Sequence, residues 1–250
     1  MDPELIKMLK YLRLSNLLTQ FDHVVEKAKE EDLSPVRWLR DIIEQEYRAK
    51  MENARKLKLC RANIPEKWLF QTFPFDRQHK LNKKKLTHLY DAFDYMTQAR
   101  NIIFIGPTGA GKTGLATAFL IQAIDRGYNG RFIPFPELVD LLYKSLADHS
   151  EEKRIKTFAA YDCLLIDELG YIELEPVQVG LFFTLMQKRH KKKTTLITSN
   201  LGFEQWASFL KNDHLTAALI DRLTEVSHIV NMKNCASLRT RLSDEPPVQP

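Results

Sequence analysis

Residues 101–113 read NIIFIGPTGAGKT, in which an apolar run leads directly into a glycine-rich segment. The chain has only 9 glycines in 250 residues, and four of them are Gly106, Gly109, Gly111 and Gly114. Glycine adopts backbone conformations that other residues avoid, so this clustering indicates an unusual turn after the apolar run. The sequence LATAFLIQAI that follows favours a helix. The stretch therefore predicts a strand, a tight loop and a helix in succession.

The glycine-rich segment has the Walker A spacing of a glycine, four residues, a second glycine, lysine and threonine. Backbone N–H groups of such a loop cradle phosphate oxygens, and the start of the following helix adds partial positive charge. We expect Lys112 to lie near the β- and γ-phosphates of ATP and the Thr113 hydroxyl to bind Mg²⁺. A glycine-rich turn without a ligand is the simpler alternative, which the strand and helix on either side disfavour. The predicted nucleotide-binding residues are Gly106, Pro107, Thr108, Gly109, Ala110, Gly111, Lys112, Thr113 and Gly114.

A second apolar run, Cys163–Ile166, ends in the adjacent carboxylates Asp167 and Glu168. A strand that ends there would place both side chains at the carboxyl edge of a sheet, beside the phosphate loop. We expect Asp167 to bind the nucleotide's Mg²⁺ and Glu168 to orient and polarise the attacking water. A small-molecule kinase needs no such glutamate, so the pair favours hydrolysis. An acidic exit from a strand without function is the alternative.

Two further polar residues are candidates with open alternatives. Asn200 follows the apolar run Thr194–Thr198, where its amide would reach the γ-phosphate or the attacking water, although Ser-Asn is also a common start of a turn. Arg222 lies in a helical stretch, where it would either pair with Asp221 or Glu225 at the surface or enter the nucleotide site of a neighbouring subunit as an arginine finger.

Short apolar runs alternate with helical stretches throughout residues 101–231. Apolar strands without polar alternation are typical of a parallel sheet that helices cover on both faces. The sequence therefore predicts an α/β three-layer sandwich with a five-stranded parallel sheet. Its predicted strands are 102–105, 131–135, 163–166, 194–198 and 228–231, and its predicted helices are 111–126, 137–158, 176–190 and 203–225.

The residues before this region predict a different organisation. Residues 1–62 form a small helical domain, in which Ser34 and Pro35 begin a long second helix. Residues 63–81 are a linker with two prolines and the aromatic residues Trp68, Phe70, Phe73 and Phe75, and from Asn82 a helix leads through Phe93 and Met96 into the ATPase domain. The predicted domains are 1–62, 63–81, 82–243 and a flexible tail, 244–250.

Composition excludes several classes of protein. Hydrophobic residues are 44% and charged residues 28%, which excludes wholesale disorder, and no apolar run reaches the ~20 residues of a membrane span. Cys60, Cys163 and Cys235 are too far apart to suggest a disulfide framework or metal site, so we expect a cytoplasmic protein with Cys163 as a buried thiol. The net charge is +5, and residues 61–100 hold 8 basic against 4 acidic residues, which is compatible with a polyanionic partner.

The motifs GPTGAGKT, LLIDELGY, LITSN and IDRL, in this order, resemble the AAA+ ATPases. More narrowly, the chain resembles the IstB-type ATPases of insertion sequences, which are related to the bacterial helicase loaders. The specific signals are DELGY at 167–171, LKYLRLSNLLTQF at 9–21 and TFPFDRQ at 72–78. The resemblance extends over about residues 9–241.

The resemblance implies additional roles by position. Asn200 would be sensor 1, Arg222 the trans-acting arginine finger, and Arg239 the sensor 2 arginine, with Arg241 left as an alternative to Arg239. Too few residues follow Arg239 for the helical lid domain of larger AAA+ proteins. The linker residues Phe75, Asp76 and Gln78 would lie beside the adenine, in addition to the loop and carboxylates named above.

The resemblance also implies a function. Such a protein would be an ATP- and Mg²⁺-dependent ATPase that binds duplex DNA with little sequence preference, oligomerises on it and assists a transposase in target selection and integration. The alternatives are a DnaC-like replicative helicase loader, a small-molecule kinase and an ATP-gated DNA-binding scaffold in which hydrolysis is incidental. Candidate DNA contacts, between which the sequence does not decide, are Lys83–Lys85, Lys144, Lys153, Arg154, Lys156 and Lys188–Lys193.

Overall fold

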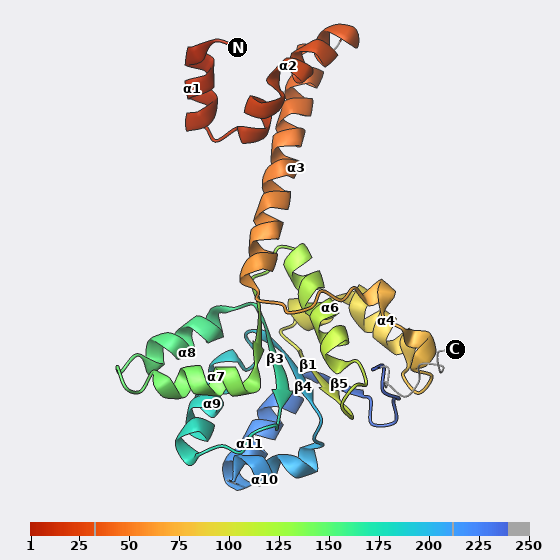
Figure 1. The fold of residues 1–250 in the computed structure, drawn as a ribbon, viewed down its shortest axis with the longest axis vertical. Coiled ribbons are helices and arrows are strands. Elements are labelled where there is room, and N and C mark those ends of the chain that lie inside the picture. Colours follow the sequence, from red (N-terminus) through yellow and green to blue (C-terminus); the bar gives the residue numbers. More distant parts are fainter. Residues whose placement is uncertain (33, 212, 240–250) are drawn as a thin grey trace, which may run out of the picture. The chain divides into compact units, whose positions relative to one another are not determined.

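The computed structural model describes residues 1–32, 34–211 and 213–239 of the chain. These residues form two compact units, one from Met1 to Leu57 and the other beginning at Lys58 (Figure 1). Within the described ranges, no helix is long and apolar enough to cross a membrane. The second unit contains the glycine-rich loop and, with it, the predicted nucleotide site.

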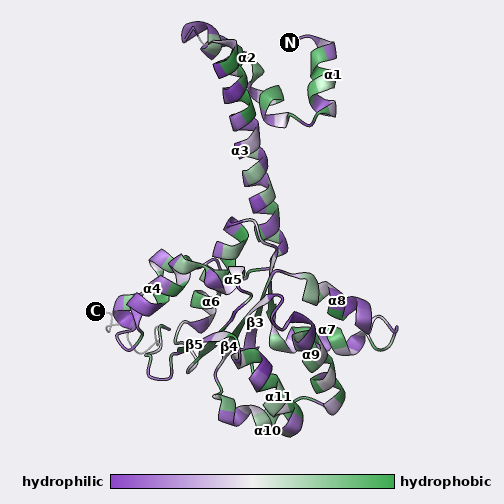
Figure 2. Cartoon of the chain, turned by 180° about the vertical axis from the view of Figure 1, so that it is seen from behind, coloured by the Kyte–Doolittle hydropathy of each residue, from purple (hydrophilic) through white to green (hydrophobic). Residues whose placement is uncertain are grey.

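The N-terminal unit is helical, as predicted. It contains α1 (Pro3–Tyr11), α2 (Ser15–Glu30) and the part of α3 (Pro35–Arg61) up to Leu57. The carboxylate of Glu46 on α3 is buried and accepts a hydrogen bond of 3.0 Å from the backbone N–H of Leu17 on α2. Apolar and polar residues alternate around α3 (Figure 2), and several of its large apolar side chains are exposed: Val36, Leu39, Ile43, Tyr47 and Met51.

The second unit is built on one parallel sheet, which confirms the predicted fold class. Within the described residues its order is β2-β3-β4-β1-β5, so that the glycine-rich loop follows a strand with a neighbour on each side. The carboxyl ends of β1, β3 and β4 therefore lie together at one edge. The strands are β1 (Asn101–Ile105), β2 (Gly130–Pro134), β3 (Cys163–Leu169), β4 (Thr194–Ser199) and β5 (Ser227–Asn231).

Two hydrophobic cores lie on opposite faces of the sheet, because successive residues of a strand point to opposite sides. Ile102 and Phe104 of β1 pack into one core and Ile103 and Ile105 into the other. The first core is covered by α4 (Lys83–Ala92), α5 (Asp94–Thr97), α6 (Lys112–Asp125) and the linker. The second is covered by α7 (Phe135–Lys144), α8 (Glu151–Ala160), α9 (Pro176–Arg189), α10 (Trp206–Leu210) and α11 (Asp213–Thr224).

Several predicted helix boundaries were wrong. The predicted helix 137–158 is two helices, because residues 145–150 form a turn in which Asp148 accepts hydrogen bonds from the backbone and hydroxyl of Ser150. Phe135 begins α7 instead of ending a strand. The predicted helix 203–225 is divided into a 3₁₀ turn (Phe203–Gln205), α10 and α11. The helix from Asn82 ends at Ala92 because Phe93 adopts a left-handed conformation with φ of 57°.

The linker packs as part of the second unit's core. Its only regular elements in the described residues are two 3₁₀ turns, Phe70–Thr72 and Phe75–Arg77. The Phe70 ring stacks on Tyr90 of α4 at 4.3 Å and meets Phe119 of α6 edge-on at 5.9 Å. These contacts hold the linker against α6. Residues 240–243 of the predicted ATPase domain and the predicted tail 244–250 lie outside the described residues.

The prediction that Cys163 is a buried thiol is confirmed. Its thiol is fully buried in β3, and burial raises its pKa to about 12. Cys235 is buried and Cys60 is exposed. Within the described residues, no group of three or more His, Cys, Asp or Glu side chains is arranged to hold a metal ion.

Arg189, at the end of α9, is buried although, among the described residues, its hydrogen bonds go to carbonyls and a hydroxyl and not to a carboxylate. Its Nε donates to the Thr195 hydroxyl at 3.0 Å, its Nη1 donates to the carbonyls of Phe158 at 2.9 Å and Tyr161 at 2.7 Å, and its Nη2 donates to the Thr194 carbonyl. Burial lowers its pKa to about 10. The side chain thus joins the end of α8 to the start of β4 and belongs to the fold.

We expect Arg189→Met to lower the free energy of unfolding by about 2–4 kcal/mol, because it leaves several buried carbonyls without donors. Urea unfolding followed by circular dichroism measures this loss. Lys188→Met, at the exposed neighbouring position, is the control and should change stability by less than about 0.5 kcal/mol. Equal stabilities of the two variants would contradict the structural role of Arg189.

Candidate functional site

The loop between β1 and α6 has a backbone that requires glycine at two positions. Gly109 and Gly111 have φ of 84° and 93°, in the left-handed region that side chains disfavour. A Cβ at Gly109 would lie 2.3 Å from the Ser237 hydroxyl oxygen, and one at Gly111 would lie 2.8 Å from Leu238. The loop is therefore enclosed on its outer side by the chain's C-terminal segment.

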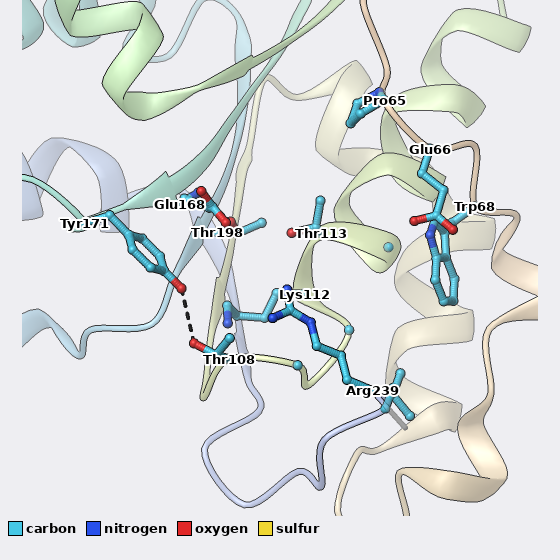
Figure 3. Close-up of a pocket in the computed structure, with 14 residues that line it drawn as sticks. Pro65, Glu66, Trp68, Thr108, Lys112, Thr113, Glu168, Tyr171, Thr198 and Arg239 are labelled. Carbon is cyan, nitrogen blue, oxygen red and sulfur yellow. Dashed lines mark hydrogen bonds between the residues drawn. The ribbon is translucent and has the colours of Figure 1, made fainter. Parts of the chain in front are cut away.

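A cavity of about 370 Å³ lies against this loop, at the carboxyl edge of the sheet. Figure 3 shows its lining residues converging from the loop, from the ends of β3 and β4, from the linker and from the C-terminal segment. Eight of the predicted site residues line it: Thr108, Gly109, Gly111, Lys112, Thr113, Gly114, Glu168 and Arg239. The other predicted residues of the loop do not line the cavity: Gly106, Pro107 and Ala110.

Lys112 occupies the floor of the cavity. Its ammonium donates hydrogen bonds to the backbone carbonyls of Gly106 at 2.8 Å and Pro107 at 2.9 Å. Burial lowers its pKa, and the charges of Asp167 and Glu168 oppose that shift. A partly buried cation beside backbone carbonyls gains most from an anion, so Lys112 is suited to bind phosphate oxygens.

Asp167, at the end of β3, is held by two threonine hydroxyls. Thr113 donates to Asp167 Oδ1 at 2.9 Å, and Thr198 of β4 donates to the same oxygen at 2.5 Å. Burial raises the pKa of Asp167, while these hydrogen bonds and Lys112 act in the opposite direction. A carboxylate beside a hydroxyl is an oxygen donor set that suits Mg²⁺ coordinated by a nucleotide. The residues present therefore fit the predicted metal.

Glu168 lies within β3 at an irregular position, where the pairing of β3 with β4 shifts in register between Ile166 and Leu169. Its φ is 63°, and its side chain is exposed and lines the cavity, whereas Asp167 before it and Leu169 after it are buried. Its backbone N–H donates to the Thr198 hydroxyl oxygen at 3.0 Å. A non-glycine residue in the left-handed region carries strain, and such strain concentrates at functional sites. The twist at Glu168 is what brings its carboxylate to the cavity.

Thr198 is a site residue that the sequence analysis missed. It lines the cavity and its hydroxyl binds both Asp167 and Glu168, while Asn200, predicted at this strand end, does not line it. The Asn200 side-chain oxygen is buried and has no hydrogen-bond partner among the described residues. Thr198 precedes the predicted Asn200 by two residues. Because residues two apart along a strand point to the same face, the choice of Asn200 could have suggested Thr198 as well.

The linker contributes different residues from those predicted. Phe75 is packed between Phe70 and Phe73, and neither it nor Asp76 nor Gln78 lines the cavity. Gln78 is buried, and its amide donates to the carbonyls of Ala110 at 3.1 Å and Ala236 at 2.7 Å. The linker residues that do line the cavity are Pro65, Glu66 and Trp68.

Trp68 lies directly over the start of α6, where a Cβ at Gly114 would be 2.8 Å from its ring. The aromatic composition of the linker was visible in the sequence, but not which ring would reach the loop.

The C-terminal segment also lies against the cavity, next to the linker. The N–H of Leu238 donates to the Gly109 carbonyl at 2.8 Å, and Arg239, whose side chain is exposed, lines the cavity (Figure 3). Arg241, the alternative to Arg239, lies outside the described residues.

Arg222 does not line this cavity. Its Nη1 donates to the Ala218 carbonyl at 3.0 Å, and its guanidinium lies over the Phe183 ring at 4.7 Å. In this structure Arg222 therefore makes contacts within α11 and with α9, away from the chain's own cavity.

Tyr171, the last residue of the DELGY motif, also lines the cavity. Its hydroxyl lies 3.1 Å from that of Thr108, so a hydrogen bond crosses the mouth of the cavity between the glycine-rich loop and the segment after β3 (Figure 3).

Comparisons with known proteins agree with this site. A family model described as "IstB-like ATP binding protein" matches residues 7–245. The chain is 28% identical over 230 residues to an ATP-binding protein of insertion sequence IS21 from Pseudomonas aeruginosa, covering 92% of this chain and 86% of that protein. It is also 28% identical to one of insertion sequence IS232 from Bacillus thuringiensis subsp. berliner, with 92% and 91% covered.

Among solved structures, the crystal structure of the DnaC helicase loader superposes with a TM-score of 0.53 at 23% identity. The match covers 60% of this chain and 88% of that one, and it shows a shared fold. Because the family model spans residues 7–245, nearly the whole chain, the chain belongs to the IstB-like ATP-binding proteins.

Proposed function

We propose that this protein hydrolyses ATP, binds duplex DNA with little sequence preference, forms a homo-oligomer on it and assists the transposase of an insertion sequence in target selection and integration. The observation that carries the hydrolytic part is the position of Glu168, which is exposed at the cavity beside the buried Asp167. Family membership supports the insertion-sequence context.

Different residues of the cavity would bind different parts of ATP and its metal ion. The loop N–H groups and the start of α6 hold phosphate oxygens, and Lys112 leaves the Gly106 and Pro107 carbonyls to bind them. Thr113 and Asp167 would hold Mg²⁺, which neutralises charge on the phosphates when it is bound. The aromatic face of Trp68 stands where the linker meets the loop and would contact the base or sugar.

Hydrolysis requires a water molecule oriented toward the γ-phosphate. Glu168 is the carboxylate placed to accept a proton from that water, and Thr198 positions Glu168 through its backbone N–H. Asn200 would have to change its position to act as sensor 1, because in this structure it does not line the cavity. Arg239 would stabilise charge on the phosphates from within the same chain.

The nucleotide would also control assembly. Arg222 from one subunit would reach the γ-phosphate bound by its neighbour, so ATP would join subunits and hydrolysis would release them. In exchange for that contact, Arg222 would give up its position over Phe183. DNA affinity would then follow the nucleotide state through the oligomer.

DNA contacts would be made mainly to phosphates by exposed lysines and arginines. The segment Lys188–Lys193 is the weakest candidate, since Arg189 is buried and Lys191 and Lys193 form ion pairs of 2.5 Å with Glu225 and Asp162. Lys144 and Lys156 also form ion pairs, with Asp140 at 2.7 Å and Glu152 at 2.8 Å, but their side chains stay exposed. They remain candidates together with Lys83–Lys85, Lys153 and Arg154.

A replicative helicase loader is the second candidate function, which the fold shared with DnaC favours. The two functions share the ATP site and differ in the partner protein. The match of the family model and of relatives from insertion sequences over about nine-tenths of the chain favours the transposition role.

Glu168→Gln should bind ATP with unchanged affinity but hydrolyse it at least about 100-fold more slowly, because the amide cannot accept a proton from water. With ATP and a long DNA duplex, the variant should remain as a large complex, while the wild-type complex decays as ATP is consumed. Phosphate release and light scattering measure the two effects. Glu173→Gln, in the segment after β3 and away from the cavity lining, is the matched control. Rapid hydrolysis by Glu168→Gln, or a wild-type protein that stays monomeric with a non-hydrolysable ATP analogue and DNA, would refute the proposal.

Thr198→Val should lower kcat by about 10- to 100-fold and raise the Mg²⁺ concentration needed for half-maximal rate, because Asp167 and Glu168 both lose a hydrogen bond. Thr198→Ser keeps the hydroxyl and should restore both values. Thr184→Val, which removes the same group from α9, is the control. A loss of thermal stability with unchanged kcat and Mg²⁺ dependence would show a structural role only.

Arg222→Ala and Glu168→Gln should each have little ATPase activity alone. An equimolar mixture on DNA should recover about a quarter of the wild-type rate, because one interface in four then pairs an intact Glu168 with an intact Arg222 from its neighbour. The rate is measured by phosphate release at a fixed total protein concentration. A mixture no more active than its parts would argue against a finger acting in trans.

A further inference from the structure

A second cavity, of about 690 Å³, lies between α4 and β5, and the nucleotide site uses none of its residues. All five residues of β5, Ser227–Asn231, line it. On the other side its walls are the apolar side chains of Leu81, Leu86 and Leu89. We call this cavity the α4–β5 groove.

The groove runs along a free edge of the sheet. In the described part of the chain, β5 pairs with β1 alone. The Asn101 N–H donates to the Val226 carbonyl at 3.0 Å, and the Met232 N–H donates to the Ile105 carbonyl at 2.6 Å, so even-numbered residues face β1. In a parallel ladder the intervening residues face the other way. The N–H and C=O groups of Ser227, Ile229 and Asn231 therefore point to the outer edge.

Such an edge is a template for another strand. Unpaired N–H and C=O groups in a row accept an extended peptide, and a helix beside the edge supplies the surface for its side chains. Ile229 is 45% exposed in the middle of the edge, and an added strand would cover it.

The rim of the groove is basic. Lys80 and Lys85 are exposed at one end, and Arg100 and His228 are partly buried along the strand. Asp94 is the acidic residue in the lining, and its Oδ2 is 3.1 Å from Arg100 Nη1. The lining therefore carries more positive than negative charge.

One donor in the groove lacks an acceptor. Arg100 Nε is buried and has no hydrogen-bond partner among the described residues, and Asp94 Oδ1 is buried without one also. His228 Nε2 lies 3.5 Å from Asp94 Oδ2, the oxygen that also faces Arg100 Nη1, so its contact is long and shared. A buried donor without a partner is uncommon, and a carboxylate of a bound segment would satisfy it.

The edge distinguishes a peptide from a nucleic acid. Phosphate oxygens only accept hydrogen bonds, so the outward carbonyls of β5 would repel them, and the apolar wall would offer them nothing. A peptide backbone pairs with both N–H and C=O groups. We propose that the α4–β5 groove binds an extended acidic segment of a partner protein, which joins the sheet as an additional strand beside β5.

The test uses the full chain and a fluorescein-labelled peptide of sequence Thr-Glu-Val-Glu-Val-Asp-Val-Glu, with Thr-Lys-Val-Lys-Val-Arg-Val-Lys as its basic counterpart. Fluorescence anisotropy should give a Kd of about 10–100 µM for the acidic peptide and at least about tenfold weaker binding for the basic one. No binding of the acidic peptide up to about 1 mM, or equal binding of both, overturns the proposal.

Two substitutions at one position test strand addition. Ile229→Pro removes an outward N–H that β1 does not use, which an edge strand tolerates, and should weaken peptide binding at least about tenfold. Ile229→Thr keeps the N–H and should bind nearly as well as the wild type. Both should keep the wild-type affinity for a fluorescent ATP analogue, which reports an intact fold independently of hydrolysis or DNA binding. Equal peptide affinity of the two variants overturns strand addition.

Charge reversal tests the rim. Lys80→Glu with Lys85→Glu should abolish binding of the acidic peptide, while Lys188→Glu with Lys192→Glu, outside the groove, should not change it. If a DNA duplex displaces the peptide and Ile229→Pro binds that duplex normally, the groove is a nucleic-acid site and the proposal fails. If the peptide binds only after residues 241–250 are removed, the chain's own C-terminal segment is the occupant of the groove and the proposal of a partner protein fails.

Discussion

The carboxylate of Asp167 is the point at which the parts of the nucleotide site meet. It accepts hydrogen bonds from Thr113 at the start of α6 and from Thr198 in β4, so three segments distant in sequence share one buried group. Burying a carboxylate costs free energy unless hydrogen bonds compensate for it. Removing either hydroxyl would therefore leave part of that cost uncompensated. The same Thr198 hydroxyl accepts the N–H of Glu168. One side chain therefore orients both the proposed metal ligand and the proposed general base.

The outer wall of the site comes from segments at both ends of the second unit. The linker places Trp68 over the start of α6, and the C-terminal segment binds the loop through Leu238. Gln78 joins the two, because its buried amide bonds to Ala110 in the loop and to Ala236. A ligand that moves the loop would therefore disturb both walls, which connects nucleotide binding physically to the linker and, through it, to the end of α3.

The sheet offers two separate candidate binding sites. The cavity with the glycine-rich loop lies at its carboxyl edge, and its lateral edge at β5 has backbone groups that no strand of the described chain pairs with. The N-terminal unit adds exposed apolar residues on α3, including Val36, Ile43 and Tyr47.

The amino-acid pattern alone was enough for the five strands, their parallel arrangement, the glycine-rich loop and the Asp167–Glu168 pair, because each depends on local features: apolar runs, glycine spacing and neighbouring carboxylates. The pattern did not predict that Thr198 and Trp68 line the cavity or that Phe75 and Gln78 do not. The lining depends on which side chains of distant segments meet at one edge of the sheet. Arg189 illustrates the same limit, as it lay within a basic run of the sequence and proved to be buried among carbonyls of α8 and β4. Local sequence specifies backbone preference and burial, whereas the partners of a polar side chain are decided only when the sheet and its helices pack.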